Sequence, residues 1–180
     1  MIIEPTNVDG CFVLSLEEFS DERGSFACSF CPQELMGAGY PYDFKIYQTN
    51  ISRNTVLGTL RGMHWQAEPS PDPKIVRNVR GAIYDVVADI RKNSPSFGQW
   101  TAQELTADNR KSMLIPPGCA HGFITLSDDT EVHYQMGEQY VPELARGMRW
   151  NDPVVDIDWP LDPVVISERD ATYPDFVAGE

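Results

Sequence analysis

Hydrophobic and polar residues alternate in short runs along most of this chain, and glycine or proline separates one run from the next. Alternation with a period of two is typical of strands with one buried face. The strands predicted in this way are 11–16, 25–30, 45–50, 56–66, 74–79, 82–90, 99–105, 112–115, 122–126 and 130–135. One brief helix is predicted at 33–36, where Pro32 precedes it and Gly37 follows it. The pattern indicates an all-β sandwich or barrel with little helix.

The length and composition fit a single globular domain. The chain has 180 residues, of which 42% are hydrophobic and 23% charged. These values are ordinary for a globular protein that buries a substantial core. The proline-rich loop at 67–73 is too short to separate two domains, and no internal repeat is present. We therefore expect residues 1–180 to form one domain.

The net charge of −13 limits the partners of this protein. Nucleic acids and anionic membrane surfaces attract a basic face, so neither is an expected partner. An anionic small substrate is compatible with the charge, because a few local Arg and Lys side chains can line a pocket. No apolar run approaches the ~20 residues of a membrane-spanning helix.

The cysteines and the N-terminal pattern bear on the compartment. The first residues lack the charged and apolar segments of a secretion signal, so we expect the cytoplasm, where thiols stay reduced. The spacing of Cys28 and Cys31 also allows a redox or metal site. A single pair without a second supports either site only weakly, and we interpret all four cysteines as structural.

Three stretches carry the candidate chemistry, and together they hold all three histidines. Arg61 and His64 lie three residues apart in the strand predicted at 56–66, so a regular pleat would place them on opposite faces. A bulge at Gly62 would bring both to one pocket. Without the bulge, a core histidine and a surface arginine are the alternative. His121 follows a tight turn and begins an apolar strand, which suits a residue at the mouth of a pocket.

The third stretch argues against a metal site. Tyr134 shares the parity of the apolar Val132, so we expect Tyr134 to face the interior and His133 to face outward. A metal bound by three histidines would need His133 inside, which disfavours a metal-dependent site. Asp170 follows an apolar run and is a candidate partner for a histidine ring, since such a hydrogen bond strengthens the ring as a base. A surface acid is the alternative for Asp170.

In these residues and the stretches around them, the chain resembles the dTDP-4-dehydrorhamnose 3,5-epimerases, a branch of the cupin superfamily. The resemblance runs from about residue 12 to residue 170. The stretches that carry it are Asp21–Gly24, Leu60–His64, Lys74–Arg77, Asp89–Gly98, Ile115–Phe123 and Arg146–Pro153. The resemblance implies an all-β, cupin-type jelly roll with short peripheral helices. It also implies a homodimer that uses no metal or organic cofactor.

The resemblance further implies an activity and the residues that perform it. The substrate would be dTDP-4-keto-6-deoxyglucose, inverted at C3 and C5 by proton removal and return through an enolate. His64 would be the base, Asp170 its partner and Tyr134 the returning acid, while Lys74 would stabilise the enolate oxygen. The positions matching substrate-binding residues are Arg61, His121, Arg23, Phe19, Gln48, Asn50, Tyr140 and Arg169, some of them supplied across the dimer.

The chain also departs from the pattern of that family around the nucleotide and the sugar. The departures are Cys28, Thr49, Gln135 and Ala145. An epimerase that inverts only one centre, or one that acts on another nucleotide-linked 4-keto sugar, is therefore an alternative. A non-catalytic or metal-dependent cupin is a lesser alternative.

Overall fold

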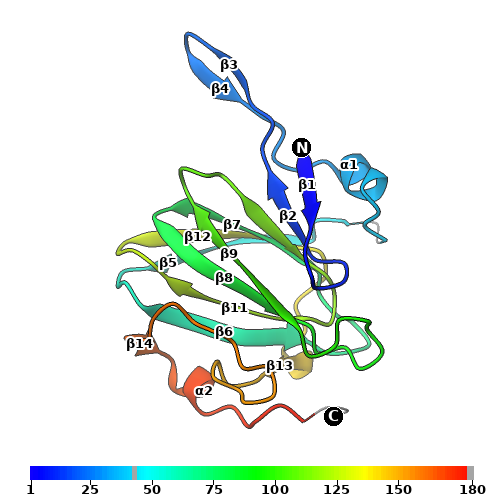
Figure 1. Cartoon of the computed structure of the whole chain (residues 1–180), viewed down its shortest axis with the longest axis vertical. Coiled ribbons are helices and arrows are strands. Elements are labelled where there is room, and N and C mark those ends of the chain that lie inside the picture. Colours follow the sequence, from blue (N-terminus) through cyan, green and yellow to red (C-terminus); the bar gives the residue numbers. More distant parts are fainter. Residues whose placement is uncertain (42–43, 178–180) are drawn as a thin grey trace.

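The computed structural model describes residues 1–41 and 44–177, which are built around two sheets packed face to face (Figure 1). The first sheet has the order β1 (Ile2–Pro5), β2 (Phe12–Ser15), β10 (Ser112–Ile115), β7 (Lys74–Arg80), β12 (Thr130–Met136) and β5 (Gln48–Asn54). The second sheet has the order β13 (Ala145–Gly147), β6 (Thr59–Gln66), β11 (Ala120–Thr125), β8 (Ala82–Ala88) and β9 (Trp100–Thr106). A short strand, β14 (Val165–Ile166), runs parallel to β6.

Strands distant in sequence pair within each sheet, as in a jelly roll. In the first sheet β10 lies between β2 and β7, and in the second sheet β11 lies between β6 and β8. Within residues 1–41 and 44–177, helix is limited to α1 (Pro32–Gly37), α2 (Glu168–Ala171) and a 3₁₀ turn at Pro142–Leu144. The predicted all-β jelly roll with short peripheral helices is therefore confirmed. Among the described residues, no helix is long and apolar enough to cross a membrane.

The predicted strand bounds hold best where the alternation is strong. β10 has the predicted bounds, and β7, β8 and β12 differ from theirs by a residue or two. The stretch predicted at 25–30 is extended only in β4 (Gly24–Phe26), which pairs with β3 (Phe19–Asp21) in a hairpin. Cys28 and Cys31 thus lie outside any strand, and all four cysteines are free. The edge strands β1 and β13 were not predicted.

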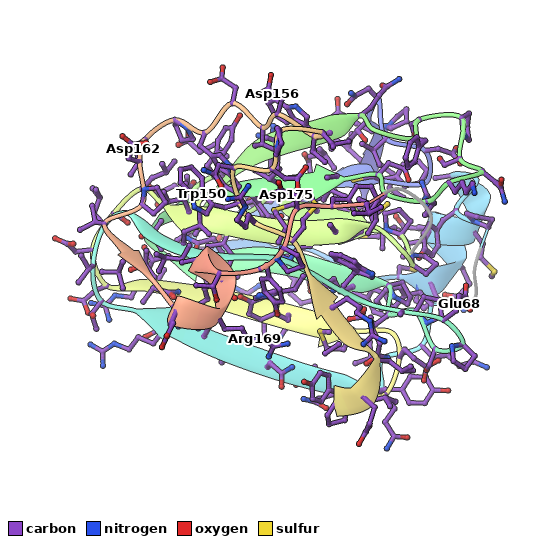
Figure 2. All side chains as sticks on the ribbon, turned by 90° about the horizontal axis from the view of Figure 1, so that it is seen from below. Glu68, Trp150, Asp156, Asp162, Arg169 and Asp175 are labelled. Carbon is purple, nitrogen blue, oxygen red and sulfur yellow. The ribbon has the colours of Figure 1, made fainter. Side chains whose placement is uncertain are left out.

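Three apolar clusters hold the layers together. The cluster between the sheets includes Val76, Phe123 and Val132. Leu35 of α1 packs on the outer face of the first sheet, and Met148 begins a segment that packs on the outer face of the second. Figure 2 shows this C-terminal segment crossing the lower face of the molecule, with Trp150 and Asp175 along it. Burial at ~25 cal/mol per Å² of apolar surface makes these clusters the main source of stability. They also fix both walls of the space between the sheets.

Candidate active site

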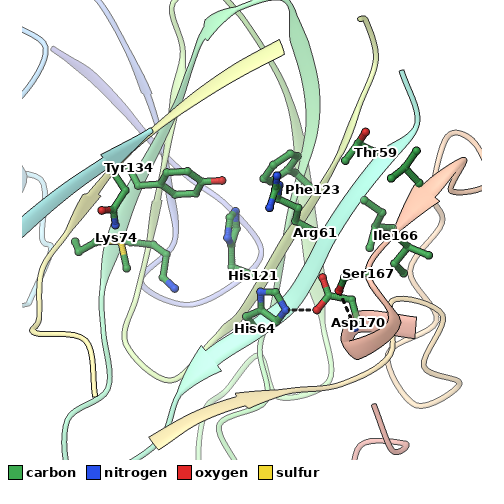
Figure 3. A pocket seen from close by; sticks show the side chains of 14 residues that line it. Thr59, Arg61, His64, Lys74, His121, Phe123, Tyr134, Ile166, Ser167 and Asp170 are labelled. Carbon is green, nitrogen blue, oxygen red and sulfur yellow. Dashed lines mark hydrogen bonds and ion pairs between the residues drawn. The ribbon is translucent and has the colours of Figure 1, made fainter. Parts of the chain in front are cut away.

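Beyond the apolar cluster, the space between the sheets opens into a cavity of about 510 Å³ (Figure 3). Strands of both sheets contribute its walls, and the segment from β14 to α2 closes one side. The lining residues are Asn50, Thr59, Leu60, Arg61, His64, Lys74, His121, Phe123, Tyr134, Met136, Val165, Ile166, Ser167 and Asp170. The structure thus brings together seven of the residues expected at the site: Asn50, Arg61, His64, Lys74, His121, Tyr134 and Asp170.

A bulge at Gly62 lets Arg61 and His64 face the same cavity. The pairing of β6 with β11 shifts register between His121 and Phe123, opposite this point. Gly62 has φ +129°, and a Cβ there would lie 2.5 Å from the Cα of Gly122. Only glycine allows both this backbone conformation and this close approach. The bulge inferred from the sequence is therefore confirmed.

His64 is hydrogen-bonded to a carboxylate. Its Nε2 lies 2.7 Å from Oδ1 of Asp170, and the backbone N–H of Gly62 donates to Oδ2 of Asp170 at 3.2 Å. The hydroxyl of Ser167 accepts the N–H of Asp170 and caps α2, which holds the carboxylate in place. Burial alone would raise the pKa of Asp170, but its hydrogen bonds to His64 and Gly62 hold the pKa below its usual value. The carboxylate therefore stays ionised, and Nδ1 is the nitrogen of His64 left for a substrate.

His121 forms a second pair of the same kind. Its Nε2 lies 2.7 Å from Oδ1 of Asp85, and both side chains are buried. Asp85 comes from β8, where it faces the space between the sheets like Ile83 and Val87. Asp85 was not among the predicted site residues. Its signal was a charged residue at a core-facing position of an apolar run, which requires a partner once buried.

Tyr134 enters the cavity from β12, on a different wall from His64 (Figure 3). Its hydroxyl lies 3.1 Å from the hydroxyl of Ser52 on β5. Burial raises the pKa of Tyr134 to about 12, against the opposing effect of its hydrogen bond to Ser52. The phenol is therefore protonated at neutral pH. His133 pairs in register with Arg77 and is absent from the cavity lining, as its parity predicted.

A smaller cavity of about 170 Å³ adjoins the first and shares His64, Lys74 and Met136 with it. Tyr140, Arg146 and Arg169 line its other parts. Lys74 is buried at the junction, where its ammonium pairs with Asp72 at 2.9 Å. The two cavities together suit an elongated anion, with cationic side chains along its length.

Three residues expected at the site lie outside both cavities. Phe19 and Arg23 belong to the β3–β4 hairpin, which projects away from the two sheets (Figure 1). Phe19 is 73% exposed, and Arg23 pairs with Asp21 of its own hairpin. Gln48 donates to Oδ1 of Asn50 at 2.7 Å, so it reaches the cavity only through its neighbour.

The described side chains provide no set of ligands for the metal-dependent alternative. Across 1–41 and 44–177, no group of three or more His, Cys, Asp and Glu side chains is arranged to hold a metal ion. His64 and His121 each direct Nε2 toward an aspartate of their own.

The two-sheet fold, with two histidine–aspartate pairs in the cavity between its sheets, defines a jelly-roll protein of the cupin type. More narrowly, the chain belongs to the dTDP-4-dehydrorhamnose 3,5-epimerase family, whose sequence model matches residues 5–178. Members of this family are isomerases.

Individual relatives agree with this assignment. A dTDP-4-dehydrorhamnose 3,5-epimerase of Methanothermobacter thermautotrophicus is 42% identical over 171 residues, which cover 93% of this chain and 90% of that protein. The crystal structure of the Bacillus anthracis enzyme with TDP and PPi bound superposes with a TM-score of 0.90 at 36% identity, covering 97% of this chain and 99% of that one. The Legionella pneumophila enzyme in complex with dTDP-4-keto-L-rhamnose gives 0.85 at 35% identity, covering 94% and 89%.

Proposed function

We propose that this protein inverts C3 and C5 of dTDP-4-keto-6-deoxyglucose, in the formation of dTDP-L-rhamnose or a related deoxysugar. The observation that carries the proposal is the placement of His64, paired with Asp170, and Tyr134 on different walls of one cavity. Epimerisation requires a base on one face of the carbon and an acid on the other. Family membership and the nucleotide-bound relatives support the choice of substrate.

In the proposed reaction, His64 removes the proton. The C4 ketone acidifies the hydrogens on C3 and C5, because the carbanion formed there delocalises onto the ketone oxygen. Nδ1 of His64 takes the proton, and the electron pair of the broken C–H bond forms the enolate. Asp170 fixes the ring through Nε2 and stabilises the imidazolium that results.

Lys74 and Tyr134 complete the proposed cycle. The buried ammonium of Lys74 faces the developing negative charge on the enolate oxygen, which lowers the energy of that intermediate. Tyr134 then gives its phenolic proton to the carbon from the face opposite His64. The phenol carries its proton at neutral pH, as this role requires.

The remaining cations and aromatics are assigned to binding. Arg61 and His121 contact the sugar and its diphosphate in this proposal, with Asn50 and Gln48 at the nucleotide end. Tyr140 and Arg169 line the adjoining cavity, where an aromatic ring can stack on the base and a guanidinium can pair with phosphate.

We also propose that the protein acts as a homodimer. Phe19 and Phe26 are opposite each other on the β3–β4 hairpin and are 73% and 78% exposed, which is unusual unless a partner covers them. A hairpin that reaches a second copy would bring Arg23 and Phe19 to the nucleotide end of the partner's site. Mixed dimers of Arg23→Ala and His64→Ala chains test this: they recover activity only if sites are shared between chains.

The proposal extends to domain organisation, compartment and cofactors. Residues 1–180 act as one domain, since both sheets share one apolar interior. Four free cysteines suit a reducing cytoplasm.

The chemistry needs no metal or organic cofactor, so activity should survive EDTA. A stoichiometric metal required for turnover would contradict the role of His64.

Proton NMR of dTDP-4-keto-6-deoxyglucose with the protein in D₂O tests the central proposal. Deuterium at both C3 and C5, with product trapped by a reductase, is the expected result. Exchange at one carbon alone would identify an epimerase of a single centre. Absence of exchange with folded protein would reject this substrate and favour another nucleotide-linked 4-keto sugar.

A further inference from the structure

A row of hydrogen bonds leads from the cavity along β5 and ends at Tyr134. Nε of Arg61 donates to Oδ1 of Asn54 at 2.7 Å. Nδ2 of Asn54 lies 3.4 Å from the hydroxyl of Ser52, which in turn lies 3.1 Å from the hydroxyl of Tyr134. Ser52 and Asn54 alternate with outward-facing residues of β5, so both face the space between the sheets.

The chemistry of the groups fixes the orientation of the Asn54 amide in this row. A guanidinium only donates, so the amide oxygen of Asn54 must face Arg61. The amide nitrogen then faces Ser52, and it also lies 3.4 Å from the carbonyl of Thr130, which only accepts. Asn54 therefore donates to Ser52, although at 3.4 Å the bond is weak. Either hydroxyl could donate across the 3.1 Å between Ser52 and Tyr134; because Ser52 accepts from Asn54, its own hydrogen is available for Tyr134.

We propose that Ser52 is a positioning residue for the returning acid: it donates a hydrogen bond to Oη of Tyr134, which leaves the phenolic hydrogen directed at the substrate. Arg61 and Asn54 set the polarity of Ser52. This inference rests on the role of Tyr134 in the proposed function.

The reverse polarity would oppose catalysis. If Tyr134 donated to Ser52, its proton would be held away from the enolate carbon. In the proposed arrangement the enolate carbon supplies the electron pair for the new C–H bond, and the O–H bond of Tyr134 breaks. Its electron pair stays on the phenolate oxygen, where the hydrogen bond from Ser52 strengthens as charge develops. The hydrogen of Ser52 is not transferred.

This role of Ser52 predicts that inversion slows relative to deuterium exchange when its hydroxyl is removed, which a merely structural role would not produce. His64 removes the substrate proton, and its imidazolium exchanges that proton with the solvent. If Tyr134 returns a proton slowly, the enolate persists and His64 returns deuterium to the original face. Loss of the Ser52 hydroxyl should therefore slow inversion while deuterium accumulates in substrate of unchanged configuration.

The experiment compares four forms of the protein with dTDP-4-keto-6-deoxyglucose in D₂O by NMR: wild type, Ser52→Ala, Ser52→Thr and Ser112→Ala. We expect Ser52→Ala to lower the rate of inversion about tenfold, the cost of one hydrogen bond to a charged group. The ratio of exchange with retention to inversion should rise by a similar factor. Ser52→Thr keeps a hydroxyl on a strand-favouring residue and should restore most of the wild-type ratio.

Ser112→Ala is the matched control. Ser112 is a buried serine of the same sheet, but its hydroxyl accepts from Arg77 at 3.0 Å, outside the cavity. Its removal should leave the ratio unchanged even if stability falls. If Ser52→Ala does not fold, Ser52→Cys supplies a side chain of similar shape with a weaker donor and should change the ratio in the same direction.

The outcomes separate this inference from the proposed function. Wild type without exchange or inversion would reject the proposed function itself. Wild-type turnover with an unchanged ratio in Ser52→Ala, or a parallel fall in both rates, would overturn the role of Ser52 alone. A raised ratio that Ser52→Thr restores would support it.

Discussion

The two histidine–aspartate pairs of the cavity have the same hydrogen-bond geometry but differ in burial. In each pair Nε2 of the ring lies 2.7 Å from a carboxylate oxygen. The His64 side chain is 43% exposed and that of Asp170 7%, whereas the corresponding values are 7% for His121 and 0% for Asp85. One ring thus stands at the open side of the cavity, and the other is enclosed by the sheets.

This difference in burial suggests different duties for the two pairs. A base must gain a charge during the reaction, which is easier where solvent and a second donor stabilise the pair. Asp170 has such support from the backbone of Gly62. Oδ2 of Asp85, in contrast, is buried without a hydrogen-bond partner among the described residues. We therefore expect the pair of His64 to carry proton transfer and the pair of His121 to hold the shape and polarity of the cavity.

The largest expected effect comes from removing the two rings in turn. His64→Asn should lower both exchange and inversion about a thousandfold, within the range for loss of a general base. His121→Asn should lower the maximal exchange rate less than about tenfold and act mainly by raising KM. Deuterium wash-in and steady-state kinetics measure both effects. Equal losses in exchange would contradict the division of duties.

For stability we expect the buried pair to matter more, so that loss of the Asp85 carboxylate destabilises the protein more than loss of the Asp170 carboxylate. Asp85→Ala leaves a buried imidazole without its partner and should cost about 3 kcal/mol of unfolding free energy. Asp170→Ala should cost about 1.5 kcal/mol, because the exposed ring of His64 can be rehydrated. Urea denaturation of the two variants beside wild type gives the comparison. If Asp170→Ala proved the more damaging of the two, burial would not be the distinguishing feature.

For activity we expect the opposite order: loss of the Asp170 charge should lower kcat more than loss of the Asp85 charge. Asp170→Asn keeps the shape of the side chain but removes the charge that stabilises imidazolium, and we expect kcat to fall about thirtyfold. Asp85→Asn should lower kcat about threefold, since the ring it holds does not take the proton. Saturating-substrate assays on both variants test this, with circular dichroism to confirm folding. A larger loss in Asp85→Asn would transfer the base to His121.

The sequence predicted much of this cavity because the informative signals were local. Alternation along β12 fixed the inward face of Tyr134, and a glycine between Arg61 and His64 pointed to the bulge that unites them. The pairing of Asp170 with His64 joins residues distant in sequence, so only the resemblance to a known family suggested it. Nothing in the chain order indicated that β14 and α2 would close one side of the cavity.

The site residues that were not predicted have one physical feature in common. Asp85, Ser52 and Asn54 are polar residues at core-facing positions of strands, and each forms a hydrogen bond with a side chain of another strand. Pattern reading assigns such residues to solvent. The edge strands β1 and β13 were not predicted because they are too short to show a clear alternation. Their pairing with β2 and β6 defines them as strands.

The smallest expected effect is on the alkaline side of the pH profile, where the two aspartates differ once more. The pKa of Tyr134 is raised to about 12, mainly by burial; the charge of Asp85 also raises it, whereas the hydrogen bond to Ser52 and the charge of Arg61 lower it. The donor form exists below this pKa, so kcat/KM for inversion should show no loss from Tyr134 between pH 8 and about 10. Asp85→Asn removes a charge that opposes the phenolate, so its activity should decline at lower pH than that of wild type. Asp170→Asn should show no such shift. Profiles of the three proteins, corrected for enolisation without enzyme, measure this, and a wild-type decline centred near pH 10 would mean that burial does not protect the phenol.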